Sequence, residues 1–554
     1  MLAVTTDQMF VAPAGETRSQ TLRDGRFILA WILALVAAKL WLVHTEDIIG
    51  SATQYDALWF VRSAKNWFWR SPYDWIAFVR PAAYPLWLAA VHFCGVRLRL
   101  ATELLELAGY ATVSYSLMRA GVARVICICA FTLLAFHPGS FRWNDYTMAD
   151  TFYAAILPFA FSALVMLLIT RRVIYALVAG FALAVLWNTR EESLLLVIVM
   201  IGFITIWMVR ERSLTRAAQH IVVPAAAMLA TFFVIVLTIY VANYRTFHAF
   251  AKSEMSAPAF EAAFKSLLRI RPTTTQRFIA VSTESLRKGF AISPTFAILA
   301  PKLDGPIGHL WKEETFNRLG IRNEIGVNWM MWAIRNAASE AGIHASAVTA
   351  DHFYKKVAGE INRACDDGRI PHRFVLLSFL DPAAWRSASY IPNSFCRMMK
   401  LFVLRYEFAA LPDDAVLLPS ERALYDEMTL RRSRDDLAKQ TDDISVRMER
   451  AVGVAHRFLV FALMLGGSVA VVRLFVVRSH FDAKDPVYAV VALLLVIIVP
   501  RIAFFTVIDA TSWPVNDERF LLPITPLANV FLLLVIYQAF PSSRAKSRDP
   551  VAAA

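Results

Sequence analysis

Carboxylate and guanidinium side chains recur in the short polar segments that separate the apolar runs of this sequence. A guanidinium group binds phosphate oxygens through two parallel hydrogen bonds, and a carboxylate can accept the proton of an attacking hydroxyl group. Polar groups beside a membrane are costly unless they have a partner or a role. Their types indicate a reaction between an anionic, lipid-borne donor and an acceptor outside the membrane. The side chains concerned are Asp56, Arg80, Asp145, Asp150, Arg190, Glu192 and Arg519.

Other polar side chains in the apolar runs have simpler explanations. Lys39 lies within a turn of the end of its run, where its ammonium group can snorkel to the membrane surface. Arg501 lies deeper and follows Pro500, so we expect it to have a partner inside a helix bundle. Glu103 and Glu106 share one helical face, and whether they line an active-site cavity is left open.

The composition is that of a membrane protein. Of the 554 residues 57% are hydrophobic and 18% are charged, and the mean hydropathy is +0.48. These values exclude a disordered chain, a coiled coil, a collagen-like fibre and an ordinary cytosolic enzyme. The net charge of +13 comes from Arg and Lys clustered beside apolar runs, which is typical of topology signals rather than of nucleic-acid binding. We therefore expect a lipid bilayer as a partner and no nucleic acid.

Ten apolar runs are long enough, or nearly long enough, to cross a bilayer. A further run at 81–95 is ambiguous. If it does not cross, every short segment on one side of the membrane is rich in Arg and Lys, as the positive-inside rule requires. The sequence thus predicts ten spans, both termini in the cytoplasm, and 81–95 in or dipping into the outer leaflet. The spans lie at about 27–43, 100–118, 123–137, 151–169, 173–187, 194–209, 220–242, 454–477, 487–507 and 520–540.

We expect an all-α polytopic membrane protein with interfacial helices in its first outer loop and a large, mostly helical extracytoplasmic insertion. Basic inner segments and short outer loops are typical of a bacterial inner membrane, with the site facing the periplasm or cell exterior. Helical periodicity predicts helices at 56–70, 257–269, 325–342, 347–366 and 418–450. The expected parts are cytoplasmic tails at 1–26 and 541–554, a transmembrane core at 27–242 with its outer loop at 44–99, a soluble domain at 243–452, and C-terminal transmembrane helices at 453–540.

Cys365 and Cys396 are the cysteines of the 243–452 domain, which would face an oxidising compartment. A disulfide between them would close a loop of about 30 residues and contribute up to about 3–4 kcal/mol. The sequence gives no Cα separation, so a bond and two free thiols are equally open at this point.

Five segments follow one another in an order that resembles a known family. They are YDALWFVRSAKN at 55–66, RPAAYPLWLA at 80–89, DYTMADTFYA at 145–154, NTREESLLL at 188–196 and NDERFLLPITPL at 516–527. Together they resemble motifs of the GT-C glycosyltransferases, integral membrane enzymes that use polyprenyl-phosphate-linked sugars. The resemblance is to bacterial transferases similar to protein mannosyltransferases, the lipid A aminoarabinose transferase and the lipopolysaccharide galacturonosyltransferases. Residues 243–452 match no enzyme domain of that family.

The resemblance implies roles for the acidic residues. Asp56 would be the general base that deprotonates the acceptor hydroxyl, and Asp150 would be the second acid, with Asp145 as a nearby substitute. Each of the three could instead cap a helix. A divalent cation bound by Asp56 and Asp150 is left open.

The resemblance also implies roles for the basic residues. Arg80, Arg190 and Arg519 would bind the phosphate of a polyprenyl-phosphate-sugar donor, and Glu192 would orient Arg190. Each arginine could instead snorkel at the membrane interface. The acceptor would be an extracytoplasmic glycolipid, polysaccharide or protein.

Two other functions compete with glycosyl transfer. A transporter or flippase of a lipid-linked or envelope precursor would place ionisable groups near the bilayer midplane and show an internal repeat. A non-enzymatic envelope assembly protein would use the 243–452 domain to bind partners and the spans as an anchor. The clustering of acids at one surface favours the transferase.

Overall fold

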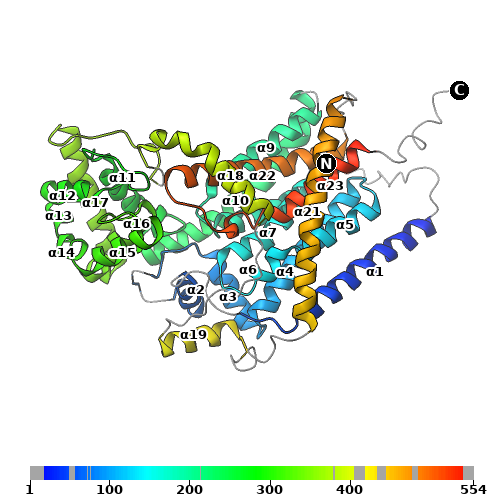
Figure 1. Cartoon of the computed structure of the whole chain (residues 1–554), viewed down its shortest axis with the longest axis horizontal. Coiled ribbons are helices and arrows are strands. Elements are labelled where there is room, and N and C mark those ends of the chain that lie inside the picture. The colour runs from blue at the N-terminus through cyan, green and yellow to red at the C-terminus, as the bar shows by residue number, and fades with distance from the viewer. Residues whose placement is uncertain are drawn as a thin grey trace, which may run out of the picture.

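A computed structural model gives the fold, and it describes residues 18–48, 56–70, 73–74, 76–211, 214–378, 381–404, 418–432, 444–476 and 485–540. Within these residues the regular secondary structure is helical, with isolated β-bridges but no strand. The fold is therefore all-α, as the sequence predicts (Figure 1).

The helices form three groups along the chain. The first comprises α1 (Arg18–Leu42), α2 (Asp56–Lys65), α3 (Ala83–Phe93), α4 (Leu98–Arg119), α5 (Arg124–Ala135), α6 (Pro138–Trp143), α7 (Ala149–Thr170), α8 (Val173–Trp187), α9 (Ser193–Glu211) and α10 (Leu214–Phe247). The second comprises η1 (Glu254–Ser256), α11 (Pro258–Arg269), α12 (Thr283–Ile292), α13 (Pro294–Ala297), α14 (Ala300–Leu303), α15 (Pro306–Leu319), α16 (Val327–Glu340), η2 (Ile343–Ala345), α17 (Ala347–Asp366), η3 (Ala384–Tyr390), α18 (Ile391–Leu404) and α19 (Pro419–Thr429). The third comprises α21 (Ile444–Val476), α22 (Pro486–Thr511), η4 (Glu518–Phe520) and α23 (Thr525–Ala539).

Six helices in the described part of the chain are long and apolar enough to cross a membrane, so the chain is a multi-pass membrane protein. Three shorter apolar helices coincide with further predicted spans, and the span predicted at 100–118 falls on α4, which carries three charged residues in its outer half. The ten-span topology stays a prediction. The six long helices are Arg124–Trp143, Ala149–Thr170, Leu194–Glu211, Ile221–Phe247, Arg447–Val476 and Pro486–Thr511.

The segment at 81–95 forms α3, which has 11 residues. At 1.5 Å per residue this helix is too short for a hydrocarbon core of about 30 Å. Its length therefore supports the prediction that this segment does not cross.

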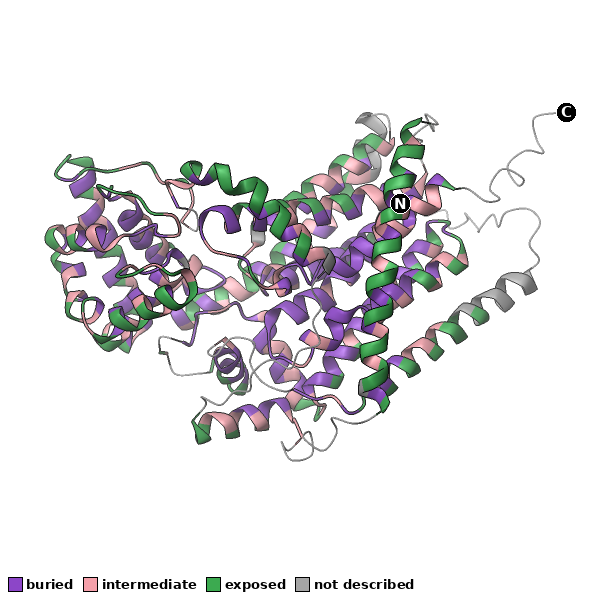
Figure 2. Ribbon diagram, in the orientation of Figure 1, coloured by how far each residue is buried: buried purple, intermediate pink, exposed green. Residues whose placement is uncertain are grey.

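The core of the bundle is centred on α7, which packs between α4 and α8. In its most apolar stretch 83% of the residues are buried, against 17% in α21 (Figure 2). Two glycines permit close helix contacts: a Cβ atom on Gly109 would lie 3.1 Å from the Ala155 carbonyl oxygen, and one on Gly180 would lie 2.3 Å from that of Met228. Small residues at such contacts are typical of membrane helices.

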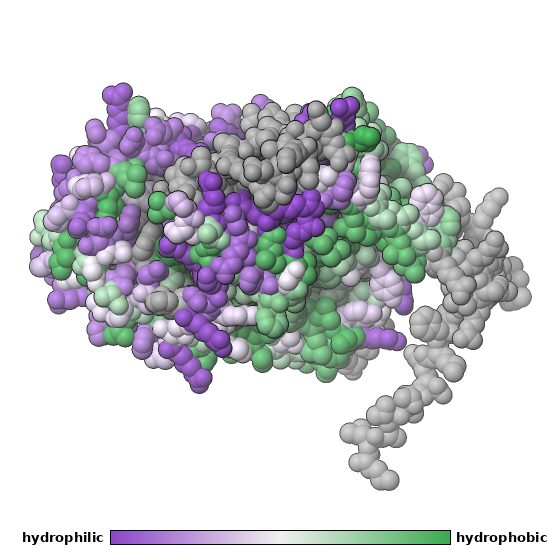
Figure 3. All heavy atoms as spheres, turned by 90° about the horizontal axis from the view of Figure 1, so that it is seen from below, coloured by the Kyte–Doolittle hydropathy of each residue, from purple (hydrophilic) through white to green (hydrophobic). Residues whose placement is uncertain are grey.

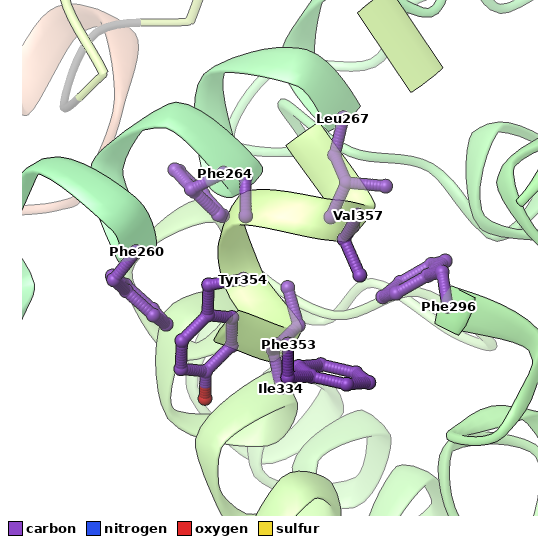
Figure 4. Close-up of a pocket in the computed structure, with 9 residues that line it drawn as sticks. Phe260, Phe264, Leu267, Phe296, Ile334, Phe353, Tyr354 and Val357 are labelled. Carbon is purple, nitrogen blue, oxygen red and sulfur yellow. The ribbon is translucent and has the colours of Figure 1, made fainter. Parts of the chain in front are cut away.

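Within residues 248–432, which we call the outer domain, α11 to α17 extend to one side of the bundle, whereas α18 packs on α22 and α19 packs on α2 (Figure 1). In the view from below, hydrophilic side chains predominate on this side, whereas hydrophobic side chains gather toward the opposite side, on the bundle (Figure 3). The outer domain has its own apolar core, in which α11 packs against α17. A cavity of about 10 Å³ lies in that core, lined by side chains such as Phe260, Phe296 and Val357 (Figure 4). It is a packing void, because it is smaller than any sugar or lipid headgroup.

Most helices predicted from periodicity are present, but two have different ends. The helix predicted at 56–70 ends at Lys65, because Trp67 and Phe68 take left-handed backbone conformations with φ of 49° and 65°. The helix predicted at 418–450 ends at Thr429, where Leu430 is left-handed with φ of 51°. Residues 433–443 of that prediction lie outside the described residues. Periodicity reports which face is apolar and carries no signal for such a local reversal.

The cysteines of the outer domain are free thiols in the structure. Cys365 is buried in the core of the outer domain, whereas Cys396 is exposed on α18. The structure therefore favours the second of the two outcomes left open above, because the two side chains lie in different environments.

Candidate active site

The first part of the site is an ion-pair group centred on Arg80. Its Nη2 atom donates to both carboxylate oxygens of Asp56, at 2.8 and 2.9 Å, and its Nη1 atom donates to Glu191 Oε1 at 3.1 Å. Asp56 opens α2, and Arg80 lies just before α3. The Asp56 side chain is 29% exposed, that of Arg80 is 24% exposed and that of Glu191 is 38% exposed. This group is therefore partly open to solvent.

The second part of the site is a buried group centred on Arg190. Its guanidinium pairs with Asp150, in the first turn of α7, and donates to Glu192 at 2.7–3.0 Å. Burial alone would raise the pKa of Glu192, but Arg190 and then Arg501 lower it to about 2. Glu192 is consequently ionised at any physiological pH. Because residues 190–192 are consecutive, the Arg80 group and the Arg190 group form one continuous cluster.

The third part of the site is the segment before α23. Arg519 Nε lies 3.2 Å from Asp517 Oδ2, and Arg142 Nη1 donates to Glu518 Oε1 at 2.7 Å. Arg519 and Arg190 lie over the ring of Phe520, at 4.9 and 6.0 Å from its centroid. Burial raises the pKa of Asp517, and the Arg519 charge opposes this rise.

These three parts bring together most of the residues that the sequence predicts. We call them the outer charge cluster. It consists of Asp56, Arg80, Asp150, Arg190, Glu191, Glu192, Asp517 and Arg519. Glu191 was not among the predicted site residues, although its position beside Arg190 was a signal for it.

Arg501 is a further guanidinium beside this cluster. Its Nε atom donates to the carbonyl oxygen of Phe520 at 2.7 Å, and its charge lies near Glu192. The expected partner inside the bundle is thus a backbone carbonyl. Its Nη2 atom is buried and has no hydrogen-bond partner among the described residues. The sequence feature that indicated a buried role for Arg501 is its position after a proline within an apolar run.

The outer domain contributes an aromatic side chain to the site. Trp332, on α16, lies with its ring centroid 4.7 Å from that of Trp59 on α2, and the Arg80 guanidinium lies 5.2 Å from the Trp332 centroid. On the same helix, Trp329 packs edge-on against Trp513, before η4. No sequence pattern connects Trp332 with Arg80, because the contact depends on how the outer domain packs on the first outer loop.

Lys252 holds the 190–192 turn in place. Its ammonium group donates to the carbonyl oxygens of Arg190 and Glu191, both at 3.0 Å, and lies 5.5 Å from the ring centroid of Trp187. The side chain is buried, and burial lowers the pKa of Lys252 to about 8. This lysine joins the outer domain to the backbone that carries the arginine.

Asp145 lies in a different group of charges. Its carboxylate accepts from Arg99 Nε at 2.7 Å, and Arg99 also pairs with Glu46 and donates to Glu103 at 2.6 Å. Lys39 completes the group, with Nζ 3.7 Å from Glu103. Burial and the Glu46 charge raise the pKa of Asp145, although Arg99 opposes the rise. We call these five residues the buried charge cluster.

The buried charge cluster corrects one expectation. Lys39 does not snorkel: it is fully buried, donates to Ser140 Oγ at 3.1 Å and lies over the ring of Phe141. Asp145 pairs with Arg99 and Asp150 with Arg190, so these two candidate acids lie in different ion-pair groups. Hydropathy alone does not predict that Lys39 is buried with partners.

The carboxylates of the outer charge cluster do not form a metal site. Among the described residues, no group of three His, Cys, Asp or Glu side chains is arranged to bind a metal ion. Asp56 and Asp150 pair with different arginines. These residues therefore do not fit the divalent cation that the sequence left open.

Comparisons with known proteins give a distant likeness. No protein-family model and no curated protein matches the chain. Among solved structures, it is similar to the crystal structure of ArnT from Cupriavidus metallidurans bound to undecaprenyl phosphate, with 14% identity, covering 87% of this chain and 77% of that one, at a TM-score of 0.32.

Proposed function

We propose that this chain is a membrane glycosyltransferase that moves a sugar from a polyprenyl-phosphate donor to an acceptor hydroxyl outside the cytoplasm. The observation that carries the proposal is the Asp56–Arg80 pair, in which Arg80 Nη2 donates to both carboxylate oxygens, and which is partly exposed and continuous with the Arg190 group. In this proposal the general base lies directly beside the guanidinium that would bind the donor phosphate. The order of the five motifs supports the same assignment.

The donor phosphate competes with Asp56 for Arg80. Arg80 is shared between two carboxylates, Asp56 and Glu191, and phosphate oxygens match the fork of a guanidinium at least as well. When the phosphate takes Arg80, the carboxylate of Asp56 is released to accept a proton. Binding of the donor thus prepares the base.

The chemical step is an inverting displacement. Asp56 accepts the proton of the acceptor hydroxyl while the oxygen of that hydroxyl forms a bond to the anomeric carbon of the sugar. The bond from that carbon to the phosphate oxygen breaks, and the polyprenyl phosphate leaves with the electron pair. Arg80 and Arg190 stabilise the negative charge of this leaving group. No nucleotide site is needed, because the lipid phosphate is the leaving group.

Asp56→Asn tests this mechanism. A general base contributes about 10²–10⁴-fold in rate, so transfer should fall at least about a hundredfold while the amount of inserted protein stays normal. The measurement is metabolic sugar labelling of membranes from cells that contain the wild type, the variant or neither. Asp74→Asn is the matched control in the same loop: Asp74 Oδ1 accepts from the N–H groups of Ile76 and Ala77 at 2.8 Å, and an asparagine retains an acceptor oxygen.

Near-full labelling by Asp56→Asn would show that Asp56 only caps α2. Labelled precursor that changes sides of the membrane without any labelled acceptor would instead identify a flippase.

A further inference from the structure

A basic pocket lies where α18 meets the segment before η4. It has a volume of about 240 Å³ and is lined by Arg397, Lys400, Leu401 and Asn516. Helix α18 packs on α22 beside the bundle (Figure 1). Its Met398 and Leu401 side chains are buried in the same apolar cluster as the core of the bundle. The pocket therefore lies where the outer domain meets the bundle.

In the part of the chain that the structure describes, the pocket lining has more positive than negative charge. Arg397 Nη1 lies 3.3 Å from Asp509 Oδ1 and donates to Asn516 Oδ1 at 3.2 Å. Arg277 donates to the carbonyl oxygens of Asp509 and Ala510, at 2.9 and 2.8 Å. Among the described residues, Asp509 is the carboxylate that faces this group, and its Oδ1 atom also accepts from the Val515 N–H at 2.8 Å.

Lys400 adds a positive charge that no described carboxylate compensates. Its side chain is exposed, and among the described residues it pairs with no carboxylate. Arg397 thus faces a carboxylate that is already engaged, and Lys400 lines the same pocket as Arg397. A partly exposed pair of positive charges of this kind is complementary to an anion.

We propose that this pocket binds the phosphate of an anionic lipid in the outer leaflet. The source is a lipid rather than free phosphate because Leu401 gives the pocket an apolar wall and α18 packs on a membrane helix. Apolar side chains on α18, Ile391 and Phe395, are 38% and 47% exposed beside the basic residues. A mixed basic and apolar surface of this kind is typical of helices that lie in the membrane interface. The inference does not depend on the proposed function.

A fluorophore placed beside the pocket tests the proposal. Cys396 is exposed and precedes Arg397, so the full chain can be labelled there after Cys94→Ser and Cys129→Ser, which remove the other exposed thiols. The labelled protein is reconstituted into vesicles of phosphatidylcholine that contain increasing fractions of brominated phosphatidylglycerol or brominated phosphatidylcholine. Quenching should occur at a lower fraction of the anionic lipid. Lys400→Gln should weaken this preference about fivefold, since one basic residue near an anionic surface contributes roughly that much.

The control removes an equal charge elsewhere on the outer domain. Lys355→Gln, on α17, changes a side chain that is 62% exposed and paired with Asp351, and it should leave the preference unchanged. Raising the salt concentration should reduce the preference of the wild type, because partly exposed charges are screened.

Three results would overturn the proposal. Equal quenching by the two brominated lipids would show that the pocket does not select anionic headgroups. An equal effect of Lys400→Gln and Lys355→Gln would show that only the total charge matters. Loss of the preference in inorganic phosphate, but not in sodium chloride of the same ionic strength, would assign the pocket to the free anion.

Discussion

Two groups of charged side chains in this molecule differ in the access of their central arginine to solvent. In the Arg80 group Asp56, Arg80 and Glu191 are 24–38% exposed, whereas in the buried charge cluster Lys39, Arg99 and Glu103 are 0–3% exposed. A partly exposed pair exchanges one partner for a ligand at a lower cost than a buried pair. In a buried pair, any charge left alone keeps its full desolvation penalty. We therefore expect the Arg80 group to be able to exchange a partner for a ligand, and the buried charge cluster to stabilise the fold.

The largest expected effect is on folding, from Arg99→Gln. This change leaves the carboxylates of Glu46, Glu103 and Asp145 without their shared guanidinium, which typically costs about 3–5 kcal/mol for a buried group. Folded protein recovered after detergent extraction, followed by thermal unfolding, measures the loss. Arg119→Gln, at the exposed end of the same helix, should change stability by less than about 0.5 kcal/mol. If Arg99→Gln keeps wild-type stability but loses sugar transfer, the buried charge cluster belongs to the active site instead.

The next largest effect is on catalysis, from Arg80→Gln. Removing a group that stabilises transition-state charge costs about 10²–10³-fold, so transfer should fall at least about a hundredfold while stability stays close to that of the wild type. Initial rates and thermal unfolding of the same preparations separate the two. Arg62→Gln, on α2, provides the control because Arg62 is 42% exposed, against 24% for Arg80, and pairs with Glu421 rather than with Asp56. A stability loss as large as that of Arg99→Gln would erase the distinction between the two clusters.

A smaller effect should follow from Trp332→Ala. The ring contacts Trp59 and Arg80, and one aromatic pair with one cation–π contact contributes on the order of 1–2 kcal/mol. We expect kcat to fall about tenfold, with most activity restored in Trp332→Phe. Steady-state kinetics with Trp385→Ala, a 72% exposed tryptophan of the same domain, as control would show whether the outer domain acts on the site. An unchanged kcat in Trp332→Ala would show that this contact of the outer domain does not contribute to the reaction.

The smallest effect is a pH dependence of stability. The folded-state pKa of Lys252, about 8, lies below the 10.5 of an exposed lysine, so the unfolded chain binds more protons between these values. Stability should therefore rise with pH, by about 1 kcal/mol between pH 7 and pH 9, and this rise should vanish in Lys252→Met. Thermal midpoints in detergent at both pH values measure it. The same rise in wild type and variant would assign it to another group.

The sequence by itself determined the all-α class, the membrane-length helices and the segments that carry charge. Hydropathy and helical periodicity depend on residues that are close in the chain, so they can be determined without the tertiary structure. The pairing of Asp56 with Arg80 was foreseen only as a shared location, because both lie in the first outer loop. Arg190 and Glu192 were foreseen together because they are two residues apart.

Only the tertiary structure decided which charges share a site. Asp145 and Asp150 are five residues apart, yet Arg99 holds the first and Arg190 the second, since α4 and the turn before α9 approach them from different sides. Lys39 is buried because Glu103 and Ser140 reach it from α4 and α6. Trp332 reaches Arg80 only through the packing of the outer domain. Such contacts join residues far apart in the chain, and their energies depend on burial, which no local pattern of residues specifies.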